Sequence, residues 1–497
     1  MILRNNYLLV FISAFLTGLS QQPLGLGFIC WFSLIPFLKV ISEQELLKEI
    51  IKYSALWGFV YNLTVVFWLS GNIGTTQLIA IILMFLVVLI LSFNTILIGI
   101  IWYQIRKKYY RYNIYIYAIA WVSVEYLRSY GLLGFPWVSL ANSQTDYIYI
   151  IQNAQITGIY GITFWILLTN IFLFRFKSYF LNNKLLIIYF SILSLPWLGG
   201  YLLYHNTDLN PNPNGLKVLV VQPNIGLSDK RDVLNKNKAL DSIVNLTKNN
   251  LNVNHKLVVW PESALPHHLL QKKEDRNYLS RKFFEYDNQY LLTGNIYYEN
   301  NNIYNSVALL NELGIQQKYH KRQLVPLAEH LPFSENFESL KSINIGQANF
   351  SKGKKDVVFN IDEYRFASLV CFESTFPNIN RRHANLGVDA IIYLVNDGWY
   401  KREPQPYQHA KQSIFRAIEN RIPIIRCANT GISMYINRRG DINQIIELNK
   451  TGTINVEINK NIYGKTFYTR FGNVFALILL TICIILLIKS FIKNEKT

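Results

Sequence analysis

Eight long apolar segments constrain this chain of 497 residues more than any other feature of its sequence. Seven precede a long polar region and one follows it: 7–22, 25–41, 53–70, 77–103, 112–127, 159–176, 184–204 and 472–492. About 20 apolar residues in a helix cross the ~30 Å hydrocarbon core of a bilayer. Only 16% of the residues are charged, whereas soluble domains carry about a quarter. The pattern predicts a membrane protein with eight transmembrane helices, of which 25–41 and 112–127 are the shortest or most polar.

Charges in the connecting loops predict which side of the membrane each loop faces. Loops 21–23 and 71–76 carry no charge, and loop 128–158 carries only Arg128 as a cation. The alternating loops and the C-terminal tail are rich in cations: Lys48, Lys52, Arg106, Lys107, Lys108, Arg111, Arg175, Lys177, Lys184, Lys489, Lys493 and Lys496. Because cationic loops stay in the cytoplasm, we expect both termini inside and the long polar region outside.

Three parts are therefore predicted. Residues 1–204 form a membrane domain with seven helices, 205–470 an extracytoplasmic domain, and 471–497 the eighth helix with a cytoplasmic tail. The first segment also fits a cleaved signal peptide because Arg4 precedes it, and this alternative leaves the side of the outer domain unchanged. The stretch LLGFPWVSL at 131–139 is too short to span; it is an interfacial or re-entrant piece or an ordinary loop.

The outer domain alternates between strand-like and helix-like patterns. Strand-like runs are 216–225, 255–263, 290–298, 305–314, 366–374, 389–397 and 422–436, and helix-like runs are 231–248, 276–287 and 405–420. Several of the strands are apolar throughout, as in central strands covered on both faces. We expect an α/β layered sandwich.

Charge and cysteine content exclude several classes of function. The net charge is +18, but no basic stripe interleaved with aromatic residues favours nucleic-acid binding. Four cysteines do not make a disulfide framework. His267 and His268 are interpreted as turn residues because no third ligand is spaced for a metal, so neither a metal nor another cofactor is expected.

Three polar residues stand at ends of apolar runs, where α/β proteins place their sites. Glu262 follows VVWP, Lys321 lies in KYHKRQLVP, and Cys371 ends SLV. A free thiol with a pKa of about 8.5 is mostly protonated at neutral pH. A neighbouring carboxylate can take its proton, and an ammonium favours the thiolate and an oxyanion. These residue types suit acyl transfer through a thioester.

Other interpretations of these residues remain open. Alone, each could be a surface or core residue, and a disulfide between Cys371 and Cys427 is the main rival to a nucleophile. Cys30 and Cys483 lie within spans and are expected to be packing residues. His409, Arg416 and Glu419 are interpreted as one ion-paired structural helix.

The ordered motifs WPES, YHKRQLVPLAE and VCFE resemble those of the nitrilase superfamily. Together with the spans and EYLRSYGLLGFPWVSLANSQ at 125–144, the chain resembles bacterial apolipoprotein N-acyltransferases nearly end to end. The resemblance implies an αββα sandwich inserted before the last helix, with Glu262 as general base, Lys321 as oxyanion stabiliser and Cys371 as nucleophile.

The resemblance also implies four supporting residues. Glu329 supports the lysine, Asn305 and Glu373 lie near the cysteine and substrate, and Trp399 lies near the pocket mouth. Ala328 and Phe372 depart from the family's usual Gly and the alternative Tyr, which leaves local loop geometry and one hydroxyl open.

The implied activity is a two-step acyl transfer in the bacterial inner membrane, on its periplasmic side. The donor is a phospholipid and the acceptor is the α-amine of a diacylglyceryl-cysteine apolipoprotein, with the bilayer as the surrounding partner. We expect a monomer and no nucleic-acid partner. Two alternatives are a membrane-tethered amidase with the same three residues and a transporter or receptor whose outer domain only binds ligand.

Overall fold

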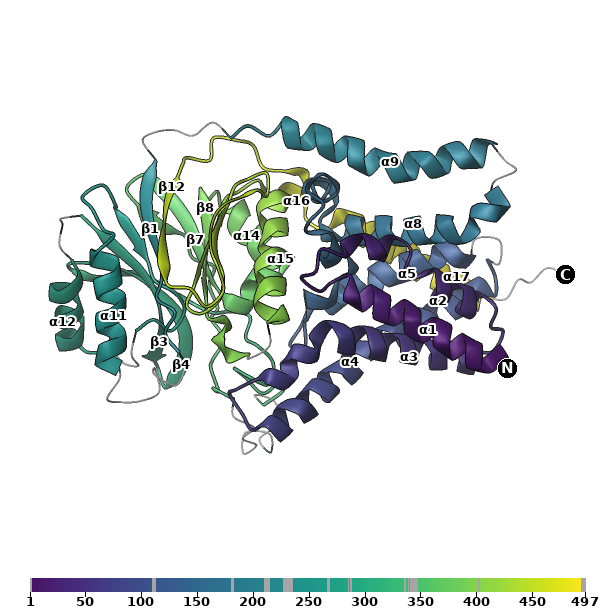
Figure 1. Cartoon of the computed structure of the whole chain (residues 1–497), viewed down its shortest axis with the longest axis horizontal. Helices are drawn as coiled ribbons and strands as arrows, with labels where there is room; N and C mark the ends of the chain where they lie inside the picture. Colours follow the sequence, from purple (N-terminus) through teal and green to yellow (C-terminus); the bar gives the residue numbers. More distant parts are fainter. Residues whose placement is uncertain are drawn as a thin grey trace. The chain divides into compact units, whose positions relative to one another are not determined.

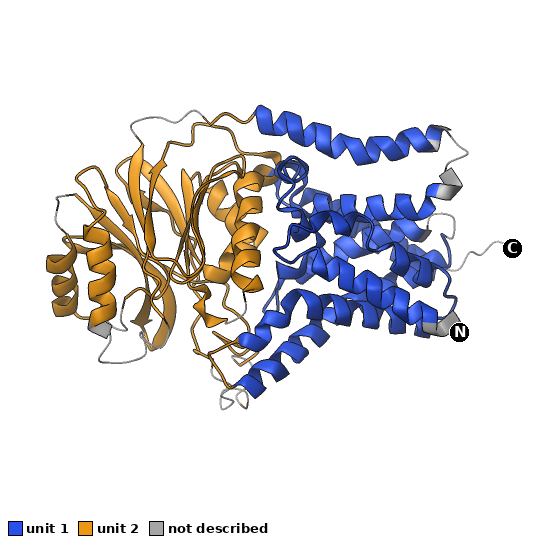
Figure 2. Ribbon diagram, viewed as in Figure 1, with its two compact units in different colours: residues 1–71, 77–206, 471–497 blue, residues 72–76, 207–470 orange. Residues whose placement is uncertain are grey.

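The structure is a computed structural model that divides into two compact units, shown in Figure 2 and described separately below. It describes residues 2–109, 113–179, 183–209, 215–226, 236–265, 269–284, 286, 288–334, 337, 339, 347–400 and 403–492. Unit 1 consists of residues 1–71, 77–206 and 471–497. Unit 2 consists of residues 72–76 and 207–470.

Unit 1 is helical. Its helices are α1 (Ile2–Leu19), η1 (Gly27–Trp31), α2 (Ile35–Ser42), α3 (Leu47–Val66), η2 (Phe67–Gly71), α4 (Gln77–Arg106), α5 (Asn113–Arg128), η4 (Pro136–Val138), η5 (Leu140–Gln144), α6 (Ile148–Ile151), α7 (Ala154–Thr157), α8 (Ile159–Tyr179), α9 (Asn183–His205) and α17 (Val474–Phe491). Among the described residues, five helices are long and apolar enough to cross a membrane: 47–71, 77–106, 159–176, 186–205 and 474–491.

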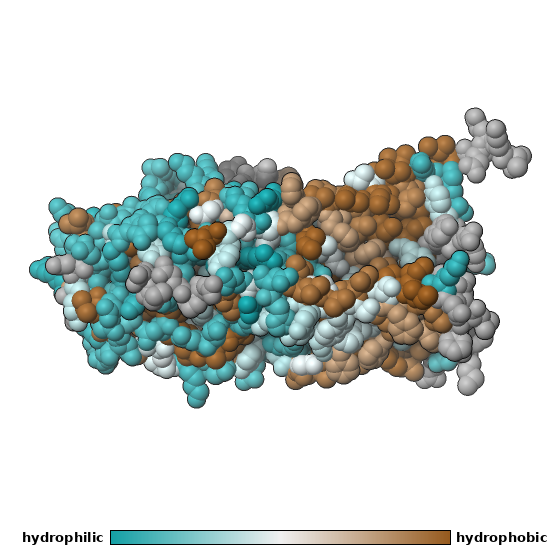
Figure 3. Space-filling view, turned by 90° about the horizontal axis from the view of Figure 1, so that it is seen from above, coloured by the Kyte–Doolittle hydropathy of each residue, from teal (hydrophilic) through white to brown (hydrophobic). Residues whose placement is uncertain are grey.

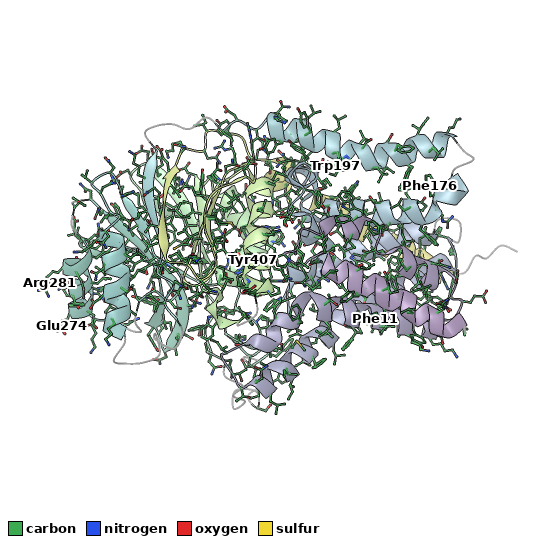
Figure 4. The ribbon with its side chains drawn as sticks, in the orientation of Figure 1. Phe11, Phe176, Trp197, Glu274, Arg281 and Tyr407 are labelled. Atoms are coloured by element: carbon green, nitrogen blue, oxygen red, sulfur yellow. The ribbon has the colours of Figure 1, made fainter. Side chains whose placement is uncertain are left out.

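Large apolar side chains are exposed along these helices. Phe93 on α4 is 60% exposed, and Phe11 on α1 and Leu198 on α9 are also exposed. Figure 4 labels Phe11 on α1 and Trp197 on α9, and Figure 3 shows hydrophobic residues gathered over unit 1 and hydrophilic residues over unit 2. Exposed apolar faces of this extent are stable in lipid rather than in water, so unit 1 has the surface of a membrane domain.

The predicted span 25–41 differs from the structure. It is broken into η1 and α2, and neither piece is long enough to span a bilayer alone. Pro36 lies in the first turn of α2, where proline favours the start of a helix and disfavours its continuation from the preceding residues. Gly27 of η1 packs closely, since a Cβ there would lie 2.0 Å from the carbonyl oxygen of Ser143. The stretch 131–139 contains the short η4, and its Pro136, Trp137 and Val138 are buried.

Unit 2 contains two six-stranded sheets (Figure 1). The first has the order β12-β1-β2-β3-β4-β5 and the second β11-β10-β9-β8-β7-β6. The strands are β1 (Leu216–Gln222), β2 (Leu257–Val259), β3 (Tyr290–Glu299), β4 (Asn302–Asn311), β5 (Gly314–His320), β6 (Phe359–Ile361), β7 (Tyr364–Val370), β8 (Ala390–Val395), β9 (Ile424–Ala428), β10 (Ser433–Ile436), β11 (Ile442–Ile446) and β12 (Gly452–Ile458).

Helices cover the outer faces of the two sheets. Figure 1 shows α11 (Lys236–Lys248) and α12 (Lys273–Phe283) beside the first sheet, and α14 (Pro377–Asn385) and α15 (Pro404–Asn420) beside the second. Unit 2 also contains the short η6 (Cys371–Thr375) between β7 and α14 and η7 (Asp397–Trp399) between β8 and α15. The short α16 (Phe467–Phe471) follows β12 in the chain. The predicted α/β sandwich is confirmed.

The central strands of each sheet are parallel. β1, β2 and β3 pair in parallel, as do β7, β8 and β9, whereas the outer pairs are antiparallel. Parallel neighbours bring their carboxyl ends to one edge of a sheet, which places the residues after β2 and β7 where sites commonly form.

The predicted elements of the outer domain differ from the structure in extent, for example at 255–263, where β2 covers only Leu257–Val259. The run 422–436 is two strands, β9 and β10, that pair antiparallel around a turn at 429–432. Gly431 in that turn lies so close to Asp397 that a Cβ would be 2.4 Å from Oδ2. The expected helix 231–248 is seen as α11, and its residues 231–235 lie outside the described residues, as do His267 and His268.

Candidate active site

Glu262 lies just after β2, on a segment anchored by the core. Trp260 is fully buried between α11 and the first sheet, and its Nε1 donates a hydrogen bond of 2.9 Å to Thr247 Oγ1. On the other side, Gly294 of β3 approaches so closely that a Cβ there would lie 2.7 Å from the Glu262 Cα. Glu262 is itself buried. Its carboxylate is therefore held in one place by packing on both sides.

Lys321 directly follows β5. Its backbone N–H donates to the Asn305 carbonyl at 2.8 Å, which continues the pairing of β4 and β5 by one residue. The ammonium is only 1% exposed and donates to both oxygens of Glu329, at 2.9 Å to Oε1 and 2.8 Å to Oε2. Glu329 thus neutralises a charge that burial alone would make costly.

Asn305 of β4 connects the two carboxylates. Its Nδ2 donates to Glu262 Oε1 at 2.8 Å and to Glu329 Oε1 at 2.9 Å. The other oxygen of Glu262, Oε2, is buried and has no hydrogen-bond partner among the described residues. This oxygen is free to accept a proton or a hydrogen bond from a reacting group.

Cys371 lies where β7 ends and η6 begins. Its φ is +50°, in the left-handed region, which costs a residue with a side chain on the order of 1–3 kcal/mol. The residue as a whole is partly exposed, in contrast to the buried residues that follow it in η6, although its thiol group is desolvated. The end of β7 thus places Cys371 in a strained main-chain conformation at the carboxyl end of a central strand.

Glu373 connects the cysteine turn with the segment after Lys321. Its fully buried carboxylate accepts one hydrogen bond from the backbone N–H of Val370 at 2.9 Å. It also accepts from the Tyr319 hydroxyl at 2.7 Å and from the backbone N–H groups of Arg322 and Gln323 at 2.8 and 3.1 Å. The Glu373 carboxylate thus links the cysteine turn after β7 with the segment after β5 that contains Lys321.

The electrostatics of the site keep the resting thiol protonated. Burial and the neighbouring Glu262 raise the pKa of Cys371 well above its usual value, and Lys321 opposes them. Burial likewise raises the pKa of Glu262, against the opposing effect of the Lys321 charge. Burial would lower the pKa of Lys321, but Glu329, Glu262 and Cys371 outweigh it and raise the pKa. The arrangement contains an acceptor for the thiol proton and a permanent cation beside the sulfur.

The two cysteines of unit 2 are separate free thiols. Cys427 is fully buried in β9, and its Sγ donates to the carbonyl oxygens of Val221 and Val259, both at 3.4 Å. This structure contains no Cys371–Cys427 bridge. Cys30 and Cys483 are buried in unit 1, in agreement with a packing role.

Trp399 lies on η7, after β8, and is 36% exposed. Its carbonyl accepts a hydrogen bond from the Ile73 N–H at 2.9 Å, and Tyr400 pairs with Asn72. Residues 72–76, which the sequence shows only as an uncharged loop, therefore pack on the η7 segment within unit 2.

Sequence reasoning missed Tyr400 and a buried polar array beside the cysteine turn. Burial, Cys371 and Glu329 raise the pKa of Tyr400, so its hydroxyl lies near the site. Asp397 and His409 hydrogen bond to each other at 2.7 Å, and Arg426 donates to Asp397 at 2.6 Å. Arg416 and Glu419 form the expected ion pair, at 3.1 Å, but His409 belongs to this other array. The motif NDGWY after β8 was the available signal for Asp397 and Tyr400.

Comparisons with known proteins agree with the two units. Residues 13–172 match the apolipoprotein N-acyltransferase N-terminal domain, and residues 217–466 match the carbon-nitrogen hydrolase family. The chain is similar to the apolipoprotein N-acyltransferase of Rickettsia bellii, with 30% identity over 94% of this chain and 95% of that protein. It is 28% identical to that of Geobacter metallireducens, over 95% and 93% of the two chains, and 27% identical to that of Thermotoga maritima, over 98% and 94%.

Proposed function

The chain belongs to the family of apolipoprotein N-acyltransferases, and from this premise we propose how its residues acylate lipoproteins. It is an acyltransferase with a carbon-nitrogen hydrolase fold attached to a helical unit with several apolar helices. Cys371 is the nucleophile, Glu262 the general base, and Lys321 the cation that stabilises the tetrahedral intermediate.

The observation that carries this proposal is the network centred on Asn305. One amide group holds Glu262 and Glu329 in place, and Glu329 in turn holds the Lys321 ammonium. Lys321 is therefore paired with Glu329 and leaves Glu262 Oε2 unpartnered in the described part of the chain. Base and cation are thus distinct groups, as a thiol nucleophile requires.

The first half-reaction acylates the enzyme. Glu262 accepts the thiol proton while Sγ of Cys371 attacks the ester carbonyl carbon of a phospholipid. Lys321 stabilises the oxyanion that forms on the carbonyl oxygen. When the tetrahedral intermediate collapses, the glycerol oxygen leaves with the proton from Glu262, which yields a lysophospholipid and a thioester on Cys371.

The second half-reaction transfers the acyl chain to nitrogen. The neutral α-amine of a diacylglyceryl-cysteine N-terminus attacks the thioester carbonyl, and Glu262 accepts a proton from the nitrogen. Collapse of this intermediate forms the amide and expels the sulfur, which recovers its proton from Glu262. Glu262 therefore acts once as base and once as acid in each half-reaction.

The proposed setting is the bacterial inner membrane. The chain crosses it eight times, with 1–204 and 471–497 as membrane parts and 205–470 on the periplasmic side, and it acts as a monomer. The alternation of cationic and uncharged loops supports this orientation. The five long apolar helices among the described residues support membrane insertion.

The proposal is tested by incubating the purified full chain with phospholipid that carries a labelled acyl chain. A hydroxylamine-sensitive adduct on Cys371, located by mass spectrometry, is expected, and it clears when a diacylglyceryl-cysteine peptide is added. An adduct that water clears equally fast would instead favour the membrane-tethered amidase. Full acylation by a Cys371→Ala variant would contradict the nucleophile and revive a ligand-binding role.

A further inference from the structure

A buried polar array contacts the main chain of Cys371 and takes no part in the steps above. His409 of α15 lies at its centre, with Nε2 at 3.1 Å from the Cys371 carbonyl oxygen and 2.9 Å from Ser374 Oγ. Its Nδ1 lies 2.7 Å from Asp397 Oδ1. Ser374, Asp397 and His409 are all buried, so they cannot reach a substrate directly.

The hydrogens of this array follow from its acceptors. A carbonyl oxygen only accepts, so the bond to Cys371 requires a hydrogen on His409 Nε2. The charged groups that face His409 are Asp397, from the segment after β8, and Arg426, from β9. His409 and Arg426 hold the pKa of Asp397 at about 2 although its burial opposes them. Asp397 is therefore an anion that accepts from Nδ1, and the ring donates from both nitrogens when it is protonated.

A neutral ring has two forms that bond differently, and burial and Arg426 lower the pKa of His409 against the opposing effect of Asp397. With its single hydrogen on Nδ1, the neutral ring donates to Asp397, and the Cys371 carbonyl loses the donor from His409. With its single hydrogen on Nε2, the neutral ring still donates to the Cys371 carbonyl, and Nδ1 accepts from Arg426 Nη2 at 3.2 Å. The charged ring and this second neutral form therefore both provide the hydrogen bond to Cys371.

Side chains hold the main chain on both sides of Cys371. One residue earlier in the chain, the Val370 N–H donates to Glu373 at 2.9 Å. The Cys371 carbonyl accepts from Ser374 Oγ at 2.7 Å and from His409 Nε2. A left-handed φ of +50° persists in a residue with a side chain only where such contacts impose it. If the peptide relaxed to a negative φ, the Cβ–Sγ bond would point in another direction.

We propose that His409, oriented by Asp397, is a positioning residue that keeps Cys371 in the left-handed conformation in which Sγ faces Glu262 and Lys321. The hydrogen bond from Nε2 to the Cys371 carbonyl carries this role, and His409 touches no reacting atom. The inference rests on the proposed role of Cys371 as the nucleophile and adds to it a requirement on the main chain.

Three variants of the full chain in detergent micelles test the proposal. His409→Leu fills the space of the ring without a donor, and His409→Gln restores an N–H at the position of Nε2. Ser413→Ala is the matched control, because Ser413 is buried one turn further along α15 and its Oγ has no hydrogen-bond partner among the described residues. The readouts are the alkylation rate of Cys371 by iodoacetamide between pH 5 and 9 and the single-turnover rate of acylation by labelled phospholipid.

We expect His409→Leu to lower both rate constants by about 10- to 100-fold, the loss that a small misplacement of a reacting group causes. His409→Gln should react within about threefold of the parent, and Ser413→Ala should match it. Mass spectrometry assigns the alkylation to Cys371, since the other three cysteines are buried.

Parent-like rates in His409→Leu would overturn the inference, as would a loss in His409→Gln as large as that in His409→Leu. If His409→Leu does not fold, as judged by circular dichroism and gel filtration, His409→Gln decides alone: near-parent rates support the hydrogen bond and a tenfold loss refutes it. If the parent forms no thioester, the proposed function fails, and the alkylation rates still decide the role of His409.

Discussion

At the scale of residues, the two carboxylates near the Lys321 ammonium make different contacts. Glu329 accepts both hydrogen bonds that Lys321 makes to it, whereas Glu262 bonds to Asn305 through one oxygen and leaves the other unpartnered in the described part of the chain. A buried ammonium between two carboxylates stays charged, as its raised pKa shows. The proposed chemistry therefore depends on Glu262, whose second oxygen is left to accept a proton.

Replacing the base or the cation separates these roles. Glu262→Gln should lower the single-turnover rate of thioester formation by about 10²–10⁴-fold, the usual contribution of a general base. Lys321→Ala should also abolish detectable adduct, because it removes the oxyanion stabiliser and leaves Glu329 buried without its cation. Quantitative mass spectrometry of Cys371 measures both, and a normal adduct in either variant contradicts the role of that residue.

The pH dependence of acylation follows from Glu262. Only the ionised carboxylate accepts the thiol proton, and burial raises its pKa above the ordinary value of about 4.3. The acylation rate should therefore increase as the pH rises through that raised pKa, and it should be low at pH values below the pKa, where Glu262 is protonated. Asn305→Ala removes a donor that favours the ionised form, so the inflection should move to higher pH.

Single-turnover acylation rates of the parent and of Asn305→Ala, measured between pH 4 and 8, check whether the inflection of the variant lies at the higher pH. A profile for Asn305→Ala that moves to lower pH, or a parent rate that does not decline in acid, would contradict the assignment of Glu262 as the base.

At the scale of elements, the site is assembled from strand ends of both sheets. The first sheet supplies Glu262 after β2, Asn305 on β4 and Lys321 after β5, and the second supplies Cys371 after β7. The Glu373 carboxylate joins the two parts, since it accepts from Val370 on one side and from Arg322 and Gln323 on the other. The packing of the two sheets thus determines how far apart the proposed catalytic groups lie.

A substitution at Gly294 tests whether the packing of β3 determines the position of Glu262. A Cβ at Gly294 would lie 2.7 Å from the Glu262 Cα and 3.0 Å from the Pro261 carbonyl oxygen, both of which are backbone atoms. Gly294→Ala should therefore displace Glu262 and lower acylation by about 10- to 100-fold. Gly452→Ala on β12 is the control, because its Cβ makes only an ordinary contact of 3.6 Å with Ile446.

The measurement for this pair is the single-turnover acylation rate of each variant, with circular dichroism to confirm that both fold. Equal rates in the two alanine variants would show that β3 does not position Glu262.

At the scale of the whole molecule, the chain combines a helical unit with exposed apolar faces and a polar two-sheet unit. The family's acyl donors and acceptors are lipids and lipoproteins, so a catalyst for both has a reason to be a membrane protein. The loop charges predict that unit 2 faces the periplasm. The cations close to the ends of the spans set the orientation of the whole chain. Cysteines introduced on the two sides of the membrane can test this orientation.

Two variants test the orientation, each with one added cysteine in a Cys371→Ala background whose three remaining cysteines are buried. Glu274→Cys lies on the exposed surface of α12, labelled in Figure 4, and Lys107→Cys lies in the cationic segment after α4. A membrane-impermeant maleimide added to intact spheroplasts should label Glu274→Cys and spare Lys107→Cys until the membrane is opened. Labelling in the opposite order would reverse the proposed topology.

The sequence by itself determined the features that depend on local pattern. Hydropathy along the chain indicates the apolar helices, and strand-like runs that alternate with helix-like runs indicate the α/β sandwich. The motifs around Glu262, Lys321 and Cys371 identify the family, which the comparisons confirmed. Burial and chemical type are properties of short stretches, so they can be recognised without coordinates. The catalytic roles of the site residues and the count of eight spans remain predictions.

Only the tertiary structure decided which distant groups meet. Gly27 packs against the Ser143 carbonyl, the amide of Asn305 joins carboxylates 43 and 24 residues away, and His409 reaches a carbonyl 38 residues earlier in the chain. Hydrogen bonds and close backbone approaches of this kind form between elements that the fold brings together. No periodicity in the sequence encodes such a contact, because its geometry exists only once the sheets have packed.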